Sequence, residues 1–244
     1  MKLTVLGMYA PYAPAGRATS GYLLEAAGRR LLLDCGSGVL ARLQRVTTPE
    51  AVDAVVLSHL HGDHITDMTL LRYALPYRKR FGMGDRDHIP VFAPSEPEAE
   101  YEMLRAMHPF DIMPLAHGMA VQLGDVALEF IELSHAYPVF GLRVRAEGKV
   151  FAYTGDTVMC GNACALAHDA DLLLCDASFL EADRTAESTH MSAAQAAALA
   201  RDNDVKQLVI THRLAHYRCA PHLAEAKAVF RRTKAAREMR RFVF

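Results

Sequence analysis

Residues 57–67 read LSHLHGDHITD, and this stretch decides how the rest of the chain is interpreted. Three histidines and two aspartates follow at once on the apolar run DAVVL, residues 53–57, which is typical of a buried strand. A solvated loop is the ordinary explanation, because loops are usually polar. The alternative is a metal site, since imidazole nitrogens and carboxylate oxygens are the usual ligands of zinc besides thiolates. The remainder of the chain has to distinguish between the two.

The composition describes a globular chain without the bulk charge of a polyanion binder. Of 244 residues, 51% are hydrophobic and the formal net charge is −1. No apolar run approaches the roughly 20 residues that span a bilayer, so we expect no membrane contact. The five cysteines form no C-x-x-C pair and the first residues lack a signal-peptide pattern, which predicts a cytoplasmic protein with reduced thiols. Twelve histidines exceed what packing requires.

Short apolar runs and helical periodicities alternate along the chain in two groups. The predicted strands cover residues 2–8, 21–27, 29–36, 53–59 and 89–94, then 119–123, 126–133, 140–147, 149–156, 170–177, 206–212 and 241–244. The predicted helices cover 39–46, 65–75 (ended by Pro76), 98–107, 162–169, 192–203 (with a capping box from Ser192 and Gln195) and 222–238. The pattern predicts one layered α/β domain over residues 1–244, with two mixed sheets inside.

Five of these strands end in His, Asp or Cys, in VVLSHLHGDH, FIELSHAY, FAYTGDT, LLCDASF and LVITHRL. Strand ends form the rim on which sites of layered α/β folds assemble. His59 and His61 are two apart, so an extended segment points both the same way, and Asp63 and His64 can face a second point nearby. This spacing favours two metals, whose shells would be completed by His135, Asp156 and His212, with Asp156 bridging. Taken alone, Asp156 in TGDT could equally be a turn aspartate.

These motifs resemble those of the metallo-β-lactamase superfamily. HLHGDH resembles its H-x-H-x-D-H signature, and LLLDCGSG its early motif with Asp34 behind the metal loops; SHAYPVFGLRV, TGDT and ITH resemble its third, fourth and fifth motifs. The resemblance covers almost the whole chain and implies a four-layer αββα sandwich. It implies that His59, His61 and His135 hold one Zn2+, that Asp63, His64 and His212 hold the other, and that Asp156 bridges. Mn2+ or iron would suit the same ligands.

Within the superfamily, the chain most resembles the ribonuclease Z-like phosphodiesterase branch. CDAS (175–178) and THMS (189–192) look like two motifs of that branch, with Asp176 replacing the glutamate that orients the phosphate-side histidine, here His190. Cys175 stands where the branch has a histidine. A helix-entry histidine before the Ser192 cap is the alternative interpretation of His190.

The tRNA-gripping arm of the branch is missing, because only 20 residues join His135 to Asp156. The basic segment at 72–88 and Arg17 in APAGRATSG are weak substitutes, so we expect no binding of a tRNA body. The implied substrate is a small-molecule or short nucleotide phosphodiester. The resemblance also makes a homodimer possible.

The sequence therefore predicts a dinuclear zinc phosphodiesterase that uses a metal-bound hydroxide, with Asp63 positioning or deprotonating the water and with His190, oriented by Asp176, acting on the leaving oxygen. Hydrolysis of a lactone or thioester on the same metals is the alternative, and the Asp176–His190 pair argues against it. A non-catalytic metal-binding member of the fold is a further alternative, which the intact set of seven ligands opposes.

Overall fold

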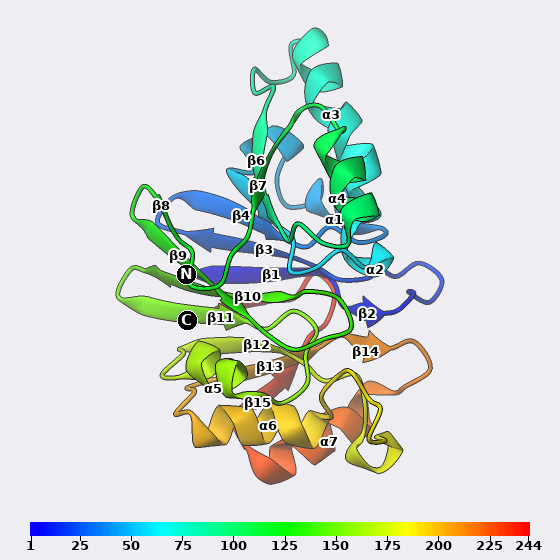
Figure 1. The fold of residues 1–244 in the computed structure, drawn as a ribbon, viewed down its shortest axis with the longest axis vertical. Helices are drawn as coiled ribbons and strands as arrows, with labels where there is room; N and C mark the ends of the chain where they lie inside the picture. Colours follow the sequence, from blue (N-terminus) through cyan, green and yellow to red (C-terminus); the bar gives the residue numbers. More distant parts are fainter.

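The computed structural model describes residues 1–244 as two stacked β-sheets with helices on both outer faces (Figure 1). Three hydrophobic clusters separate the four layers. The largest, of 27 buried residues, lies between the sheets, and clusters of 21 and 23 buried residues lie beneath the two helical layers. The predicted αββα sandwich is therefore the observed architecture.

Each sheet has seven strands and mixes antiparallel with parallel pairing. The first has the order β16-β1-β3-β4-β5-β6-β7. Its strands are β1 (Lys2–Gly7), β3 (Gly21–Ala26), β4 (Arg29–Leu33), β5 (Ala54–Val56), β6 (Ile89–Ala93), β7 (Phe110–Pro114) and β16 (Arg241–Val243). From β4 to β7 the strands run parallel.

The second sheet has the order β15-β13-β12-β11-β10-β9-β8. Its strands are β8 (Ala120–Leu123), β9 (Val126–Glu132), β10 (Phe140–Ala146), β11 (Lys149–Tyr153), β12 (Leu172–Asp176), β13 (Leu208–Thr211) and β15 (Thr233–Ala235). The strands β11, β12, β13 and β15 are parallel, so their carboxyl ends meet at one edge. A short ladder of β2 (Tyr9–Ala10) and β14 (Arg213–Leu214) lies beside this edge.

Alternation of side chains along each strand fills two clusters at once. In β4, Leu31 and Leu33 point into the cluster between the sheets, whereas Leu32 points under the first helical layer. In β12, Leu174 points between the sheets and Cys175 outward. Strands buried on both faces explain why so many of the runs are continuously apolar.

The helices cover the outer faces of the sheets. The helices α1 (Val39–Leu43), α2 (Gly62–Ile65), α3 (Met68–Arg80) and α4 (Glu98–Arg105) belong to the first half of the chain, and α5 (Gly161–Ala167), α6 (Ala193–Asp202) and α7 (Cys219–Val229) to the second (Figure 1). Two 3₁₀ turns span Pro49–Ala51 and Glu181–Asp183. At the start of α6, the Ser192 hydroxyl accepts from the Gln195 amide and the Gln195 side chain bonds the Ser192 amide, so the predicted capping box is confirmed.

The prediction that Pro76 ends a helix is wrong. The helix α3 runs from Met68 to Arg80 with Pro76 inside it. Pro76 is exposed, so water can take the place of the backbone hydrogen bond that proline forfeits. Beyond it, Arg78 makes a bidentate ion pair with Glu50, with N–O distances of 2.6 and 2.7 Å, which holds the last turn on the body.

Two further assignments need correction. The helix predicted over 222–238 spans only Cys219–Val229, because residues Thr233–Ala235 pair with β13 as a parallel strand. Thr233 and Ala235 are buried there, and this tertiary contact overrides the helical tendency of the sequence. The strand β7, which was not predicted, pairs with β6 at the edge of the first sheet, where the Asp and Pro of FDIMP are tolerated.

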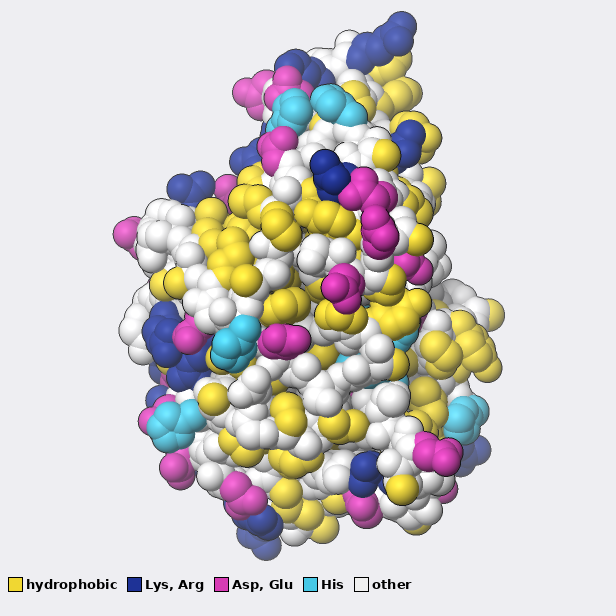
Figure 2. All heavy atoms as spheres, viewed as in Figure 1, with side chains coloured by type: hydrophobic (Ala, Val, Ile, Leu, Met, Phe, Trp, Pro, Cys, Tyr) yellow, Lys and Arg dark blue, Asp and Glu magenta, His cyan; other side chains and the backbone are white.

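The end of α3 projects from the body, and Figure 2 shows dark blue and yellow side chains gathered there. Tyr73, Tyr77 and Phe81 are exposed. Two of its basic residues are neutralised within the protein, Arg78 by Glu50 and Lys79 by Asp87. No helix of the chain is long and apolar enough to cross a membrane.

Candidate metal centre

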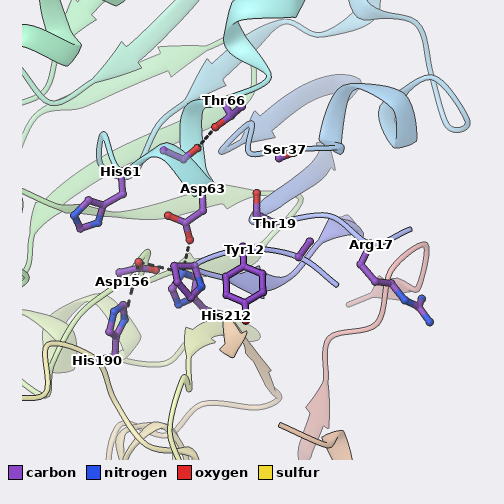
Figure 3. A pocket seen from close by; sticks show the side chains of 13 residues that line it. Tyr12, Arg17, Thr19, Ser37, His61, Asp63, Thr66, Asp156, His190 and His212 are labelled. Atoms are coloured by element: carbon purple, nitrogen blue, oxygen red, sulfur yellow. Dashed lines mark hydrogen bonds and ion pairs between the residues drawn. The ribbon is translucent and has the colours of Figure 1, made fainter. Parts of the chain in front are cut away.

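All seven predicted ligands lie together at the edge where the parallel strands end. His59 and His61 follow β5, and Asp63 and His64 lie in α2, which begins directly after His61. The other three come from loops that follow β9, β11 and β13, at His135, Asp156 and His212. Figure 3 shows Asp63, Asp156 and His212 turned toward one another, with His61 beside them.

A first group combines three imidazoles with one carboxylate, and its ligand atoms lie close enough to hold one ion. The Nδ1 of His61 is 2.9 Å from the Nε2 of His59 and 3.3 Å from the Nε2 of His135. The Oδ2 of Asp156 lies 3.3 Å from the His59 Nε2. These separations are close to the edge of a zinc tetrahedron, about 3.3 Å for bonds of 2.0–2.1 Å.

A second group consists of Asp63, His64 and His212. The Nε2 atoms of the two histidines are 3.1 Å apart, and the Asp63 Oδ2 lies 3.3 Å from that of His212 and 3.6 Å from that of His64. The Asp156 Oδ2 lies 3.3 Å from the His64 Nε2 and 3.2 Å from the His212 Nε2. The same oxygen of Asp156 therefore lies close to nitrogen atoms of both groups, which is the position that the predicted bridging role would require.

The chemistry of these donors fits metal ions. The His64 Nδ1 is 2.7 Å from Asp34, and the His212 Nδ1 is 2.9 Å from the Ser178 hydroxyl, whose own proton goes to Asp176. Both Nδ1 atoms thus carry the proton in the neutral rings, so the two Nε2 lone pairs face each other across 3.1 Å. A cation between them, either a proton on His64 or a metal ion, removes that repulsion. The Oδ1 of Asp156 is also buried without a hydrogen-bond partner.

Outer hydrogen bonds fix the orientation of the ligand rings. The His59 Nδ1 lies 3.1 Å from the Ser58 hydroxyl, and the His135 Nδ1 lies 3.0 Å from the Thr189 carbonyl oxygen. His61 uses Nδ1 toward the site, and its ring stacks on Tyr137 with 4.0 Å between centroids. Sequence reasoning missed these contacts, although Ser58 and Tyr137 each lie within two residues of a predicted ligand.

Asp34 is the hub of the outer contacts. It is fully buried and accepts from the Ser58 amide at 2.7 Å, the Ser58 hydroxyl at 2.9 Å, the His64 Nδ1 at 2.7 Å and the Tyr153 hydroxyl at 2.5 Å. Its backbone has a φ of 55°, a left-handed conformation that aspartate tolerates better than most residues. The buttressing position implied for Asp34 agrees with this geometry.

Burial and neighbouring charges give the ligands the protonation states that metal binding requires. Burial, with the neighbouring His64, lowers the pKa of His59 to about 4, and burial lowers the pKa of His61 and of His135. Burial alone would raise the pKa of Asp156, but the imidazoles of His212, His64 and His59 hold it well below its usual range. His64 is the exception: burial would lower its pKa, but the carboxylates of Asp156, Asp34 and Asp63 outweigh burial and raise it well above the usual value, so a metal ion would have to displace that proton.

His190 lies beside the second group and points into the same cleft (Figure 3). Its Nδ1 is 2.9 Å from the Oδ2 of Asp176, and its ring stacks on that of His212 with 5.1 Å between centroids. Burial would lower the pKa of His190, but the carboxylates of Asp176 and Asp156 outweigh it and raise the pKa to about 9. Asp176 is itself held by the Ser178 amide and hydroxyl and by the Thr157 amide.

Cys175, which stands where the similar motif of the ribonuclease Z-like branch has a histidine, lies outside the site. It is fully buried in the cluster beneath the second helical layer, on the opposite face of β12 from Asp176. Burial raises the pKa of its thiol. The substitution therefore removes no group that faces the metals.

The site opens into a cleft of about 650 Å³. Besides the ligands and His190, its walls are formed by the segment Pro11–Thr19, notably Tyr12, Arg17 and Thr19, and by Ser37. Tyr12 is 65% exposed and stands at the mouth (Figure 3). Of these residues the sequence singled out only Arg17; the Pro- and Gly-rich composition of the segment was the one signal for a loop.

Comparison with known proteins places this geometry in a family. Residues 29–213 match the model described as a beta-lactamase superfamily domain. The chain belongs to the metallo-β-lactamase superfamily. The probable metallo-hydrolase YhfI of Bacillus subtilis is 30% identical over 94% of each chain, and its crystal structure superposes with a TM-score of 0.90 at 26% identity, covering 99% of this chain and 98% of that one.

Members of the ribonuclease Z type are also similar to the chain. Ribonuclease Z of Methanosarcina acetivorans is 25% identical over 98% of this chain and 96% of its own. A diphosphatase of the PhnP family has the same fold, with a TM-score of 0.79 at 18% identity over 100% of this chain and 97% of that one. This chain therefore belongs to the ribonuclease Z-like branch of the superfamily, as its motifs indicated.

Proposed function

We propose that this metallo-hydrolase of the β-lactamase superfamily is a dinuclear zinc phosphodiesterase that cleaves a small or nucleotide-type phosphodiester. The observation that carries the proposal is the His190–Asp176 pair, placed in the cleft directly beside the metal ligands. Carboxyl-type hydrolysis needs the metals and water but has no evident use for this additional imidazole at the leaving-group side. The kinship with ribonuclease Z supports the same class of substrate.

In this proposal His59, His61 and His135 would hold one zinc, Asp63, His64 and His212 would hold the other, and Asp156 lies close enough to both groups to be a ligand shared between them. When bound, such a pair of ions supplies Lewis acidity and a water nucleophile at neutral pH. Iron or manganese would suit the same donors, and metal analysis distinguishes them.

The other catalytic roles, which are positioning the water and acting on the leaving oxygen, would fall to side chains of the protein. Asp63 and Asp156 both line the open cleft, and Asp63 is the more exposed of the two, so it is placed to orient the attacking water or to accept its proton. His190 commits Nδ1 to Asp176, and its Nε2 makes no hydrogen bond within the protein. That nitrogen is the one available to stabilise or protonate the leaving oxygen. Asp176 acts through His190 and is a positioning residue.

The shape of the site supports a small substrate. The strands β10 and β11 are joined by a tight turn at Glu147 and Gly148, both with positive φ, so no arm extends from this position. On the basic segment that begins in α3, Arg78 and Lys79 are already ion-paired, and Arg72 lies over Tyr73. Neither feature offers a grip for a tRNA body.

A substrate screen after metal analysis tests the proposal. The zinc-loaded protein is assayed with bis(p-nitrophenyl) phosphate, cyclic nucleotides, a lactone and a thioester. We expect turnover of at least one phosphodiester, and a decrease on His190→Ala for that substrate. Turnover of the lactone or thioester alone would favour carboxyl-type hydrolysis instead. Two zinc ions with no turnover of any compound would favour a binding protein.

A further inference from the structure

A second hollow lies next to the catalytic cleft and is lined by three arginines. It has a volume of about 360 Å³, and its walls include Arg17, Arg213 and Arg237 together with Tyr9 and Glu238. Arg17 also lines the catalytic cleft, so the two hollows meet at this side chain. Figure 3 shows Arg17 extending away from the metal ligands toward the C-terminal segment.

Arg213 is held in place with an unused donor. It follows His212 in the chain and lies in β14, whose pairing with β2 fixes the backbone. Its guanidinium lies over the Tyr9 ring, 5.2 Å from the centroid, and donates one hydrogen bond of 3.0 Å to the Tyr9 hydroxyl. Its Nη1 makes no hydrogen bond within the protein, and Arg213 forms part of the wall of the hollow.

The charges in the hollow favour an anion. Glu238 is its one carboxylate, and that group is already occupied: it accepts from the Ala18 amide at 2.7 Å and from Arg17 at 3.0 Å, and Arg42 lies 3.4 Å away. Arg213 and Arg237 have no acidic partner, and the Arg237 side chain is exposed. Cys219, the first residue of α7, also forms part of the wall, where a helix N-terminus adds partial positive charge.

We propose that this hollow binds a second phosphate group of the substrate, so that the enzyme prefers phosphodiesters that carry an additional phosphate monoester. This inference rests on the proposed phosphodiesterase function and specifies its substrate class. Guanidinium groups bind phosphate by paired, charge-assisted hydrogen bonds, and the free donors of Arg213 and Arg237 supply them. Arg17, between the two hollows, would contact the portion of the substrate that joins the two phosphates.

The test compares the dinucleotide ApA with its 5′-phosphorylated form pApA. Binding is measured by calorimetry on zinc-loaded His190→Ala, with and without Arg237→Gln, so that binding is read separately from turnover. Arg237 is exposed, so its substitution leaves the fold intact. Arg231→Gln is the matched control, because it removes an exposed arginine of the same C-terminal segment outside the hollow. KM and kcat for both dinucleotides are measured on the parent protein.

We expect pApA to bind roughly tenfold more tightly than ApA, and Arg237→Gln but not Arg231→Gln to remove most of that preference. In the parent protein the preference should appear in KM. Equal affinities for the two dinucleotides, or a preference that Arg237→Gln leaves unchanged, would overturn the inference; so would inorganic phosphate binding in the hollow without any preference between the dinucleotides. A preference in binding without cleavage of either compound would support the hollow and count against the phosphodiesterase function.

Discussion

The Nδ1 of His190 lies 2.9 Å from the Oδ2 of Asp176, and this pair stands directly beside the predicted metal ligands Asp156 and His212. Asp176 also accepts the proton of the Ser178 hydroxyl, which in turn lies 2.9 Å from the Nδ1 of the predicted ligand His212. One buried carboxylate thus orients both the ligand and the additional histidine. Hydrogen bonds through Asp176 and Ser178 thus fix the position of His190, which faces the cleft, relative to the predicted ligand His212.

Replacing His190 by alanine should lower kcat for a phosphodiester by about 10²–10⁴-fold and leave the zinc content unchanged, because general acid catalysis contributes that much and His190 is not a predicted ligand. Turnover and metal analysis on the same preparation check this. His168→Ala serves as the control, since that histidine is 64% exposed and pairs only with Asp169. Loss of zinc from His190→Ala would show that its role is structural.

Asp176→Asn should reduce kcat for the same substrate through His190, because the amide no longer holds the imidazole as a carboxylate does. The double variant with His190→Ala should then be about as slow as His190→Ala alone, since residues that act as a unit give non-additive effects. Steady-state kinetics on the four proteins of the cycle measure the coupling. Multiplicative losses in the double variant would mean that Asp176 acts mainly through Ser178 and the predicted ligand His212 and not through His190.

The buried Asp171, which precedes β12 at the end of the strand opposite to the ligand site, should make stability depend on acid pH. Burial would raise the pKa of Asp171, but hydrogen bonds from Lys206, the Val150 amide and Lys149 outweigh it and lower the pKa. A carboxylate with a lowered folded-state pKa contributes stability above its unfolded value, about 3.9, and loses it as pH falls through the folded value. Asp171→Asn should therefore lower the free energy of unfolding at pH 7 by about 1 kcal/mol.

Urea denaturation of Asp171→Asn at several pH values checks this expectation. The difference from the parent protein should shrink as the pH falls below about 4, where the carboxylate of the parent protein becomes protonated. Asp125→Asn, at an exposed turn, should behave like the parent protein at every pH. A difference that stays constant with pH would assign the loss to packing.

Glu238 should anchor the segment that forms one wall of the cleft. Its side chain is 6% exposed and accepts from the buried Ala18 amide at 2.7 Å. Glu238→Ala leaves this amide without an acceptor, which should destabilise the protein by about 1–3 kcal/mol. Hydrogen exchange should show faster exchange over Pro11–Thr19, and KM should rise more than kcat falls. Unchanged exchange in that segment would show that its conformation does not depend on Glu238.

The fold could be predicted where local pattern and tertiary structure agree. Continuous apolar runs such as residues 53–57 become strands buried on both faces, and the residues that follow them meet at one edge. Prediction failed where a contact from elsewhere decides the outcome. The ion pair between Arg78 and Glu50 stabilises the turn of α3 that follows Pro76. Residues Thr233–Ala235 pair with β13 as a strand, although their sequence favours a helix.

For the site, the sequence indicated the residues but not their support. The seven ligand positions lie after strands, where the pattern of His and Asp can be recognised. The hydrogen bonds from Tyr153 to Asp34 and from His212 to Ser178 join residues far apart in the chain, so no local sequence pattern predicts them. The same holds for the arginine-lined hollow, which brings Arg17 and Arg237 together only in three dimensions.

Titration of the metal-free protein with zinc, followed by the rate of bis(p-nitrophenyl) phosphate hydrolysis, tests the central claim most directly. Because the Asp156 Oδ2 lies within 3.3 Å of ligand nitrogens in both groups, we predict little activity at one equivalent and a rise that levels off at two. Full activity at one equivalent would contradict the dinuclear site. No hydrolysis at two bound equivalents would contradict the phosphodiesterase.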